Sequence, residues 1–260
     1  MLRRLLSALG VYKIYHKWLR YQIKHGKKPE HIGVILDGNR RWASLHELAP
    51  WEGHRRGAEK VREFLRWCLD LGIKTITLYV FSTENFQRPR KEVEEIMRLA
   101  EEYLRQVIED ESIHKHRVRI KALGRINLLP ESLRRMIKEV EERTKDYDGF
   151  YLNIAIAYGG RAEIVDAARK IAKEVAEGRL RLEEVDEEVF EKYLYTSHLP
   201  QQDPDLIIRT SGESRLSGFL LWQSAYSELC FMDVYWPEFR EIDLERAIRT
   251  FQRRKRRFGR

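Results

Sequence analysis

The sequence predicts an α/β fold: a single domain with a mostly parallel, six-stranded central sheet flanked by helices. Short runs of Val, Ile, Leu and Tyr occur without polar alternation, as expected for strands that are buried on both faces. Amphipathic helical patterns separate most of these runs, which indicates strand–helix–strand units. The 260 residues contain no internal repeat, low-complexity linker or clear domain boundary, so one α/β domain is the simplest arrangement.

The elements follow one another in a regular order along the chain. The predicted strands are residues 31–36, 74–81, 117–123, 150–157, 205–209 and 228–234. Apolar residues recur at helical spacing between them and after the last strand, which predicts helices over 58–71, 90–112, 133–140, 164–175 and 244–251. The stripe on 90–112 is the longest, and the rest of that segment is highly charged. Such a stripe is typical of a helix with one face in the core.

Charge is distributed unevenly along the chain. Residues 1–28 contain eight Lys/Arg and no acidic residue, and residues 249–260 contain seven Lys/Arg and no acidic residue. The 34 remaining basic residues are outnumbered by 41 acidic ones. The body of the protein is therefore acidic and both ends are basic. This pattern argues against a nucleic-acid partner, which favours a continuous basic surface.

The basic N-terminal segment, 1–28, allows two interpretations. Its leucines and aromatic residues form a rough helical stripe beside cationic residues, which fits a helix lying in a membrane interface. The same stripe also fits a helix that docks on the protein. Its apolar runs are too short to span a bilayer, and arginines interrupt it early, which argues against a secretory signal.

Cys68 and Cys230 both lie in apolar surroundings. They are typical of buried thiols and indicate neither a disulfide framework nor a zinc site. A reducing compartment follows, and we predict a cytoplasmic protein, with peripheral contact to the inner face of the membrane if the N-terminal segment binds lipid.

Polar residues follow four of the predicted strands at the point where each ends. These stretches are residues 37–41, 82–89, 158–161 and 209–215, and each supplies arginine together with glycine, serine or asparagine. In open α/β sheets, ligands bind beyond the carboxyl ends of the strands. Guanidinium groups and free backbone N–H groups bind phosphate, and Asp37 is placed to hold Mg²⁺ against it. The sequence therefore predicts a phosphate site at this edge.

These same stretches resemble a known family. The chain is similar to the cis-prenyltransferases, the undecaprenyl diphosphate synthase-like enzymes, from about residue 28 to the C-terminus. The motifs that carry the resemblance, in order, are DGNRRWA, GHRRG, FSTENFQRP, NIAIAYGGRAEI, PDLIIRTSGESRLSGFLLWQSAYSE and DVYWPEF. It divides the chain into the basic segment 1–28 and a catalytic domain over 29–260.

The resemblance implies an activity. Such enzymes add isopentenyl diphosphate repeatedly to an allylic primer, here farnesyl or geranylgeranyl diphosphate. They make a long Z-polyprenyl diphosphate, the precursor of a glycosyl carrier lipid, and release diphosphate. They require Mg²⁺, act as homodimers, and hold the growing chain in a hydrophobic tunnel between sheet and helices. Ala100, the smallest apolar position on the predicted helix over 90–112, is expected in the tunnel wall, where bulk would limit chain length.

The resemblance also assigns roles to individual residues. Asp37 would position Mg²⁺ on the leaving diphosphate, Glu228 would be a second metal ligand, and Asn85 would assist proton removal. An amide is a poor base, so we expect Asn85 to orient the substrate while diphosphate or water takes the proton. The residues expected around the allylic diphosphate are Gly38, Asn39, Arg40, Arg41, Trp42, His54, Ser82, Thr83, Glu84 and Phe86. Arg209, Arg215 and Ser217 are expected to bind isopentenyl diphosphate, with Arg88 nearby, and Leu216 is a further expected substrate-binding residue.

Some positions depart from the pattern of the family. Pro50 stands where bacterial relatives usually carry an arginine for the allylic diphosphate, so this contact must come from elsewhere. Arg257, Phe258 and Gly259 form an R-x-G tail, which in relatives crosses the dimer to the isopentenyl diphosphate. Two other functions stay open: a non-catalytic phosphate-binding scaffold that activates a partner, and a nucleic-acid or membrane-surface binder that uses the basic ends.

Overall fold

A computed structural model describes residues 11–254. Within this part of the chain, six strands form one all-parallel sheet in the order β3-β4-β2-β1-β5-β6. The strands are β1 (His31–Ile35), β2 (Thr75–Ser82), β3 (Val118–Leu123), β4 (Phe150–Tyr158), β5 (Leu206–Arg209) and β6 (Glu228–Phe231). The predicted fold class is confirmed, and each predicted strand matches an observed one.

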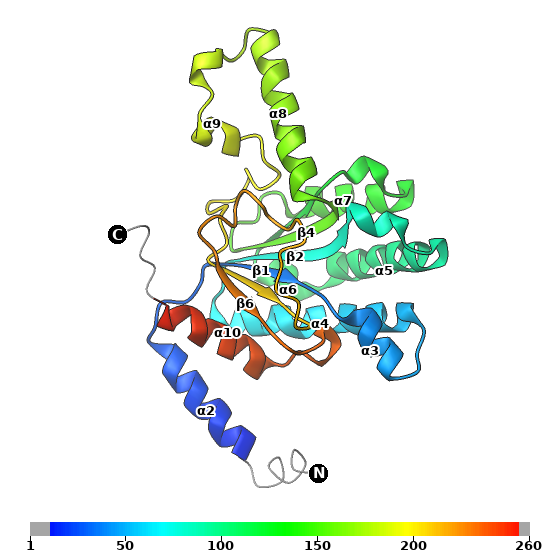
Figure 1. Ribbon diagram of the computed structural model, residues 1–260, viewed down its shortest axis with the longest axis vertical. Coiled ribbons are helices and arrows are strands. Elements are labelled where there is room, and N and C mark those ends of the chain that lie inside the picture. The colour runs from blue at the N-terminus through cyan, green and yellow to red at the C-terminus, as the bar shows by residue number, and fades with distance from the viewer. Residues whose placement is uncertain (1–10, 255–260) are drawn as a thin grey trace.

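Helices connect and cover the strands (Figure 1). The α-helices are α2 (Val11–Lys24), α3 (Asn39–Leu45), α4 (Pro50–Leu71), α5 (Arg90–Glu109), α6 (Glu111–Lys115), α7 (Glu131–Thr144), α8 (Gly160–Ala176), α9 (Glu187–Glu191) and α10 (Glu241–Arg253). Short 3-10 turns lie at Thr83–Gln87, Ile126–Leu128, Leu182–Glu184 and Trp236–Glu238. The helix predicted over 90–112 is two helices, because Asp110 accepts a hydrogen bond from the backbone N–H of Ser112 and begins α6.

The two faces of the sheet are covered differently. Alternate residues of β1 separate them: Ile32 and Val34 belong to the larger core, formed with α4, α5, α7 and α10, whereas Ile35 belongs to a smaller one. Phe219 covers that second face and packs on Tyr79 with ring centroids 4.9 Å apart. The larger core is where the sheet and the long helices meet, so it is also where a cavity beside the sheet can form.

The N-terminal helix α2 is docked on α10. Leu19 and Ile23 are buried in the larger core, and Arg20 and His16 both bind the buried carboxylate of Glu245. Trp18 lies on the exposed side of α2. The docked-helix interpretation of this segment is confirmed for the described residues. Contact with a membrane stays a prediction. No helix among residues 11–254 is long and apolar enough to cross a bilayer.

Candidate active site

The site begins where β1 ends. Asp37 and Gly38 turn the chain out of the sheet, and α3 starts at the next residue. Gly38 has a φ of 101°, in the left-handed region that favours glycine. A Cβ at this position would lie 2.6 Å from the ring of Tyr235. The turn therefore requires glycine both for its backbone conformation and for the space it occupies.

Asp37 lies between two arginines. Arg209 Nη2 donates to Asp37 Oδ2 at 2.8 Å, and Arg41 Nη2 lies 3.2 Å from Oδ1. The backbone N–H of Gly38 donates to the same Oδ1 at 2.7 Å. Thr210 Oγ1 donates to the Asp37 carbonyl oxygen at 2.7 Å. The backbone and the carboxylate of Asp37 are thus both fixed by residues that follow β5.

Arg209 connects Asp37 to the loop that follows β5. Its position is set by the parallel register, because Arg209 is aligned with Ile35 at the carboxyl end of β1. The Nη1 group donates to Ser217 Oγ at 2.8 Å and to the carbonyl oxygen of Arg215. Arg209 is only 5% exposed. A buried guanidinium with fixed partners is preorganised to bind an anion at the mouth of the site.

A second cluster of charged groups gathers around Glu92 in α5. His54 Nε2, Arg88 Nη1 and Arg40 Nε lie 3.1, 3.2 and 3.6 Å from Glu92 Oε1. They come from α4, the turn before α5, and α3. The carboxylate thus draws together Arg40 and His54, which the resemblance places around the allylic diphosphate, and Arg88, which it places near isopentenyl diphosphate.

Asn85 has a fixed orientation. It lies in the 3-10 turn after β2, and its Oδ1 accepts a hydrogen bond from the backbone N–H of Ser82 at 3.0 Å. That bond is half of a capping box between Ser82 and Asn85. The side-chain oxygen of Asn85 is therefore engaged by the backbone, and its NH₂ group is left to donate a hydrogen bond to a substrate. This geometry agrees with an orienting role and not with that of a base.

Burial and neighbouring charges set the protonation states of Asp37 and His54. Burial raises the pKa of Asp37, but the hydrogen bond and charge of Arg209, together with Arg41, outweigh burial and hold the pKa below its ordinary value. Burial lowers the pKa of His54, and the charges of Arg88 and Arg40 lower it further, against the hydrogen bond to Glu92. At neutral pH the site thus presents an ionised aspartate and a neutral histidine.

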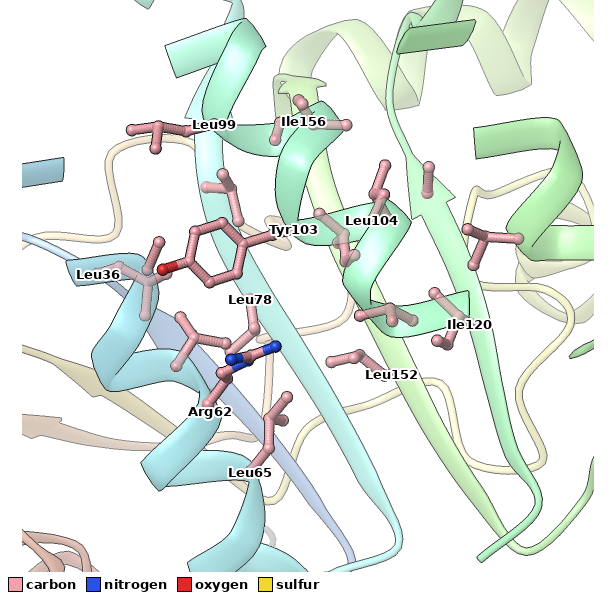
Figure 2. A pocket seen from close by; sticks show the side chains of 18 of the residues that line it. Leu36, Arg62, Leu65, Leu78, Leu99, Tyr103, Leu104, Ile120, Leu152 and Ile156 are labelled. Carbon is pink, nitrogen blue, oxygen red and sulfur yellow. The ribbon is translucent and has the colours of Figure 1, made fainter. Parts of the chain in front are cut away.

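The polar pocket opens into an apolar tunnel. Both cavities are lined by Leu36, Asn39, His54 and Val80. The tunnel runs between α4, α5 and the sheet, and its cavity volume is about 220 Å³. Figure 2 shows its wall, with leucine and isoleucine side chains on both helices and strands. Its lining includes Leu65, Leu78, Leu99, Leu104, Ile120, Leu152 and Ile156.

A bulge and a polar pair shape this tunnel. The register between β2 and β4 shifts on either side of Phe81, and the neighbouring Val80 lines both cavities. Arg62 of α4 places its guanidinium 5.7 Å from the ring centroid of Tyr103 in α5. Figure 2 shows these two side chains facing each other across the gap between the helices. This contact ties the two helical walls together.

Most of the residues predicted from the sequence meet in one place. Those that line the polar pocket are Asp37, Gly38, Asn39, Arg40, Arg41, His54, Ser82, Asn85, Arg88, Arg209 and Ser217. Pro50 also lines it. Six others lie on adjoining segments outside its lining: Trp42, Thr83, Glu84, Phe86, Arg215 and Leu216. Phe86, for example, packs edge-on against Phe81 with ring centroids 4.9 Å apart.

Glu228 is not brought to Asp37 within the chain. It begins β6, is aligned with Leu206, and forms an ion pair with Arg254 at 2.6 Å. Asp37 lies instead beyond the level of Arg209, three residues further along β5, which is about 10 Å at the rise of a strand. Parallel register thus places Asp37 and Glu228 toward opposite ends of the sheet within one chain. The role of Glu228 as a second metal ligand stays a prediction.

Two residues of the site were missed by sequence reasoning. Glu92 sits on a helix rich in acidic residues, so nothing in the sequence singles it out. Glu213 follows β5 in the loop that supplies the site, and Arg41 Nη1 lies 3.3 Å from its Oε1. The signal for Glu213 was its position after a strand end. The R-x-G tail, 257–259, lies outside the described residues.

Comparison with known proteins decides the family. The family described as "Putative undecaprenyl diphosphate synthase" matches residues 35–259. This chain belongs to the undecaprenyl diphosphate synthase family. The tritrans,polycis-undecaprenyl-diphosphate synthase (geranylgeranyl-diphosphate specific) of Methanopyrus kandleri is 57% identical over 98% of this chain and 93% of its own length. The protein of the same name from Methanocaldococcus jannaschii is 54% identical over 98% and 91%.

A solved structure shares this architecture. The crystal structure of lavandulyl diphosphate synthase from Lavandula x intermedia, in complex with dimethylallyl diphosphate, superimposes with a TM-score of 0.86 at 38% identity. The match covers 90% of this chain and 99% of that one. The resemblance noted from the motifs is confirmed, and the chain is a member of a prenyltransferase enzyme family.

Proposed function

We propose that this enzyme adds isopentenyl diphosphate repeatedly to an allylic diphosphate and makes a long Z-polyprenyl diphosphate. The observation that carries the proposal is the junction of the two cavities, where an arginine-rich pocket opens into an apolar tunnel. One end of the site suits diphosphates and the other suits a hydrocarbon chain that lengthens away from them. A purely polar pocket would not hold the hydrocarbon chain, and a purely apolar pocket would not bind the diphosphates.

Geranylgeranyl diphosphate is the primer that we propose. The relatives from Methanopyrus kandleri and Methanocaldococcus jannaschii are both described as geranylgeranyl-diphosphate specific, and their identity to this chain exceeds half. We further propose that the product is long and serves as the precursor of a glycosyl carrier lipid. The apolar lining of the tunnel, which continues from the polar pocket, supports a hydrocarbon product.

Magnesium is the metal that this site fits. Asp37 offers a carboxylate at the pocket mouth beside the groups proposed to bind diphosphate, and Mg²⁺ prefers one or two carboxylates together with phosphate oxygens. Asp37 is therefore the residue that would hold the ion. Bound there, Mg²⁺ would neutralise charge on a departing diphosphate.

The side chains divide the work of the reaction. The allylic C–O bond breaks and releases diphosphate, and a new C–C bond forms to isopentenyl diphosphate. The proton lost as the Z double bond appears goes to the released diphosphate or to water. Arg209 and Ser217 bind the diphosphate of isopentenyl diphosphate. Arg40, Arg88 and His54, which meet at Glu92, bind the allylic diphosphate. The cluster of Arg40, Arg88 and His54 would stabilise the negative charge that develops on the leaving allylic diphosphate. Asn85 donates through its NH₂ group and orients the substrate.

A chain-elongation assay tests this function. The purified protein is incubated with radiolabelled isopentenyl diphosphate and one primer at a time, dimethylallyl, farnesyl or geranylgeranyl diphosphate, with and without Mg²⁺. We expect a long, apolar, labelled product that requires Mg²⁺ and is formed fastest from geranylgeranyl diphosphate. Chromatography of the product gives its chain length.

The same assay separates the alternatives. A relative such as the Methanocaldococcus jannaschii enzyme serves as the positive control under identical conditions. If the control incorporates label and this protein alone does not, the proposal fails and a non-catalytic scaffold becomes the better description. Incorporation that is equal with and without Mg²⁺ contradicts the metal assignment alone.

A further inference from the structure

Glu92 is a buried acidic residue in a site that binds anions. It is 3% exposed and lies in the first turn of α5. Burying a carboxylate is costly unless it is paired, and here one of its oxygens faces three partners. A negative charge at this position opposes an incoming diphosphate, so its presence requires a reason beyond stability.

The partners of Glu92 are the groups proposed to bind the allylic diphosphate. Arg88 Nη1 donates to Glu92 Oε1 at 3.2 Å, His54 Nε2 lies 3.1 Å away and Arg40 Nε 3.6 Å away. A carboxylate oxygen only accepts, so His54 must carry its proton on Nε2 to bind it. In this arrangement the Glu92 carboxylate stands in for a phosphate oxygen. It keeps Arg88, His54 and Arg40 pointing toward one position.

Glu92 lies on the helix that forms one wall of the tunnel. Ile96, Leu99 and Tyr103 follow it on α5 and line the cavity. Two of its partners come from other helices, since Arg40 is on α3 and His54 on α4. The contacts of Glu92 thus connect the tunnel helix to the diphosphate pocket, and a ligand that competes for these cations acts on α5.

We infer that Glu92 is a positioning residue that holds Arg40, Arg88 and His54 ready for the allylic diphosphate and couples its binding to the tunnel helix α5. This inference rests on the proposed function. It predicts an exchange of partners, in which diphosphate oxygens replace Glu92 on the three groups and the first turns of α5 are freed from the pocket.

Calorimetry with inorganic diphosphate alone tests the first half. Glu92→Gln keeps the shape and removes the charge, so the three groups are no longer neutralised in the empty site. We expect diphosphate to bind Glu92→Gln about 5-fold more tightly than wild type at low salt. The matched control is Glu94→Gln, an exposed glutamate on the same helix that pairs with Arg90, which should leave the affinity unchanged.

A double-mutant cycle assigns the effect to this cluster. In an Arg88→Ala background, the gain in diphosphate affinity from Glu92→Gln should shrink, because one of the competed cations is gone. Steady-state kinetics add a readout that loss of stability would not produce. We expect kcat for Glu92→Gln to fall about 10-fold while KM for the primer is not raised, since binding is kept and positioning is lost.

Hydrogen exchange of the wild-type protein tests the coupling and requires no variant. With saturating diphosphate, the amides of residues 94–99 should exchange faster, while those of α10 stay unchanged. Equal diphosphate affinity in wild type and Glu92→Gln, or weaker affinity in the variant, overturns the inference, as does unchanged exchange in residues 94–99. Failure of the wild-type protein to bind diphosphate overturns instead the proposed function.

Discussion

Asp37 is the residue on which the polar pocket is centred. Its carboxylate accepts hydrogen bonds from Arg209 and Gly38 and forms an ion pair with Arg41. In return it neutralises two guanidinium groups that would otherwise repel each other. The same carboxylate is the group that we propose to hold Mg²⁺. Its two roles, arranging the arginines and carrying charge, can be separated by experiment.

Asp37→Asn tests the charge of this residue. The amide keeps the size of the side chain and loses its negative charge, so both the metal site and the arginine pairing weaken. We expect kcat to fall at least about 100-fold, with the melting temperature changed by only a few degrees. Initial rates and thermal unfolding measure the two effects. Activity within about 3-fold of wild type would refute the role of Asp37.

The pKa of Asp37 depends on Arg209. Burial raises this pKa, whereas the hydrogen bond and charge of Arg209, with Arg41, lower it below the ordinary value. The carboxylate should thus stay ionised as the pH falls past about 3.9. In Arg209→Ala the pKa should rise, because burial is then opposed by Arg41 alone. Carboxyl ¹³C NMR measures the pKa of Asp37 in wild type and in Arg209→Ala. Asp203 serves as an internal reference whose pKa should not change.

At the scale of elements, a line of buried polar groups crosses three strands. His31 Nε2 lies 2.8 Å from Thr77 Oγ1, Asn153 Nδ2 donates to the same hydroxyl at 3.0 Å, and His198 Nε2 lies 2.9 Å from Asn153 Oδ1. These groups connect β1, β2 and β4 inside an otherwise apolar sheet. Burial lowers the pKa of His31 and of His198 to about 4.

This ladder predicts a pH dependence of stability. Between about pH 6.5 and 4, unfolded His31 binds a proton that the folded protein excludes, so the free energy of unfolding falls as the pH is lowered through this window. The full effect for His31 is about 3 kcal/mol. Urea unfolding of wild type and His31→Gln at several pH values measures it. An identical slope in the two proteins would contradict the prediction.

The pairing of α4 with α5 over the sheet makes the tunnel. Ala100 lines it from α5. Ala100→Leu should shorten the product, because the added side chain occupies space that the growing hydrocarbon needs, and should cost less than about 1 kcal/mol of stability, since it points into open space. Chromatography of the labelled product gives the length. Glu94→Leu, on the exposed side of α5, is the control, and products of equal length in wild type and Ala100→Leu would contradict the assignment.

At the scale of the whole molecule, the N-terminal helix completes the core. Leu19 and Ile23 of α2 are buried in the larger core, and Gln252 Nε2 donates to the carbonyl oxygen of Ile23 at 3.1 Å. The chain that precedes β1 therefore contributes to the same hydrophobic cluster as the tunnel helices. Its other side carries Trp18 and Tyr21, which are exposed, so the membrane prediction concerns that side alone.

Leu19→Ala tests this contribution. The side chain is fully buried, and truncating such a leucine costs about 2–5 kcal/mol. The matched variant Ile14→Ala lies on the same helix at an exposed position and should cost no more than about 0.5 kcal/mol. Equilibrium unfolding in urea compares the two. Equal costs would mean that α2 does not pack on α10 in solution.

Sequence patterns predicted the strands well because apolar runs are local signals. All six strands were placed within a few residues, and the pocket contains most of the residues predicted for it. The patterns did not single out Glu92, and they could not show where Glu228 lies relative to Asp37. Glu228 depends on the register of β6 against β5, and Glu92 depends on how α5 meets α3 and α4. Neither relation is written in a short stretch of chain.

The sequence by itself determined the class of sheet, the polar residues at its carboxyl edge and the family, since these depend on local composition and on motifs in a fixed order. The tertiary structure decided which charges meet. Arg209 reaches Asp37 across more than 170 residues because β1 and β5 pair in parallel register. Glu92 contacts Arg40, Arg88 and His54 of the polar pocket, and α2 has one apolar side in the core and the other on the surface. Both arrangements depend on packing between helices that are distant in the sequence, which no local pattern contains.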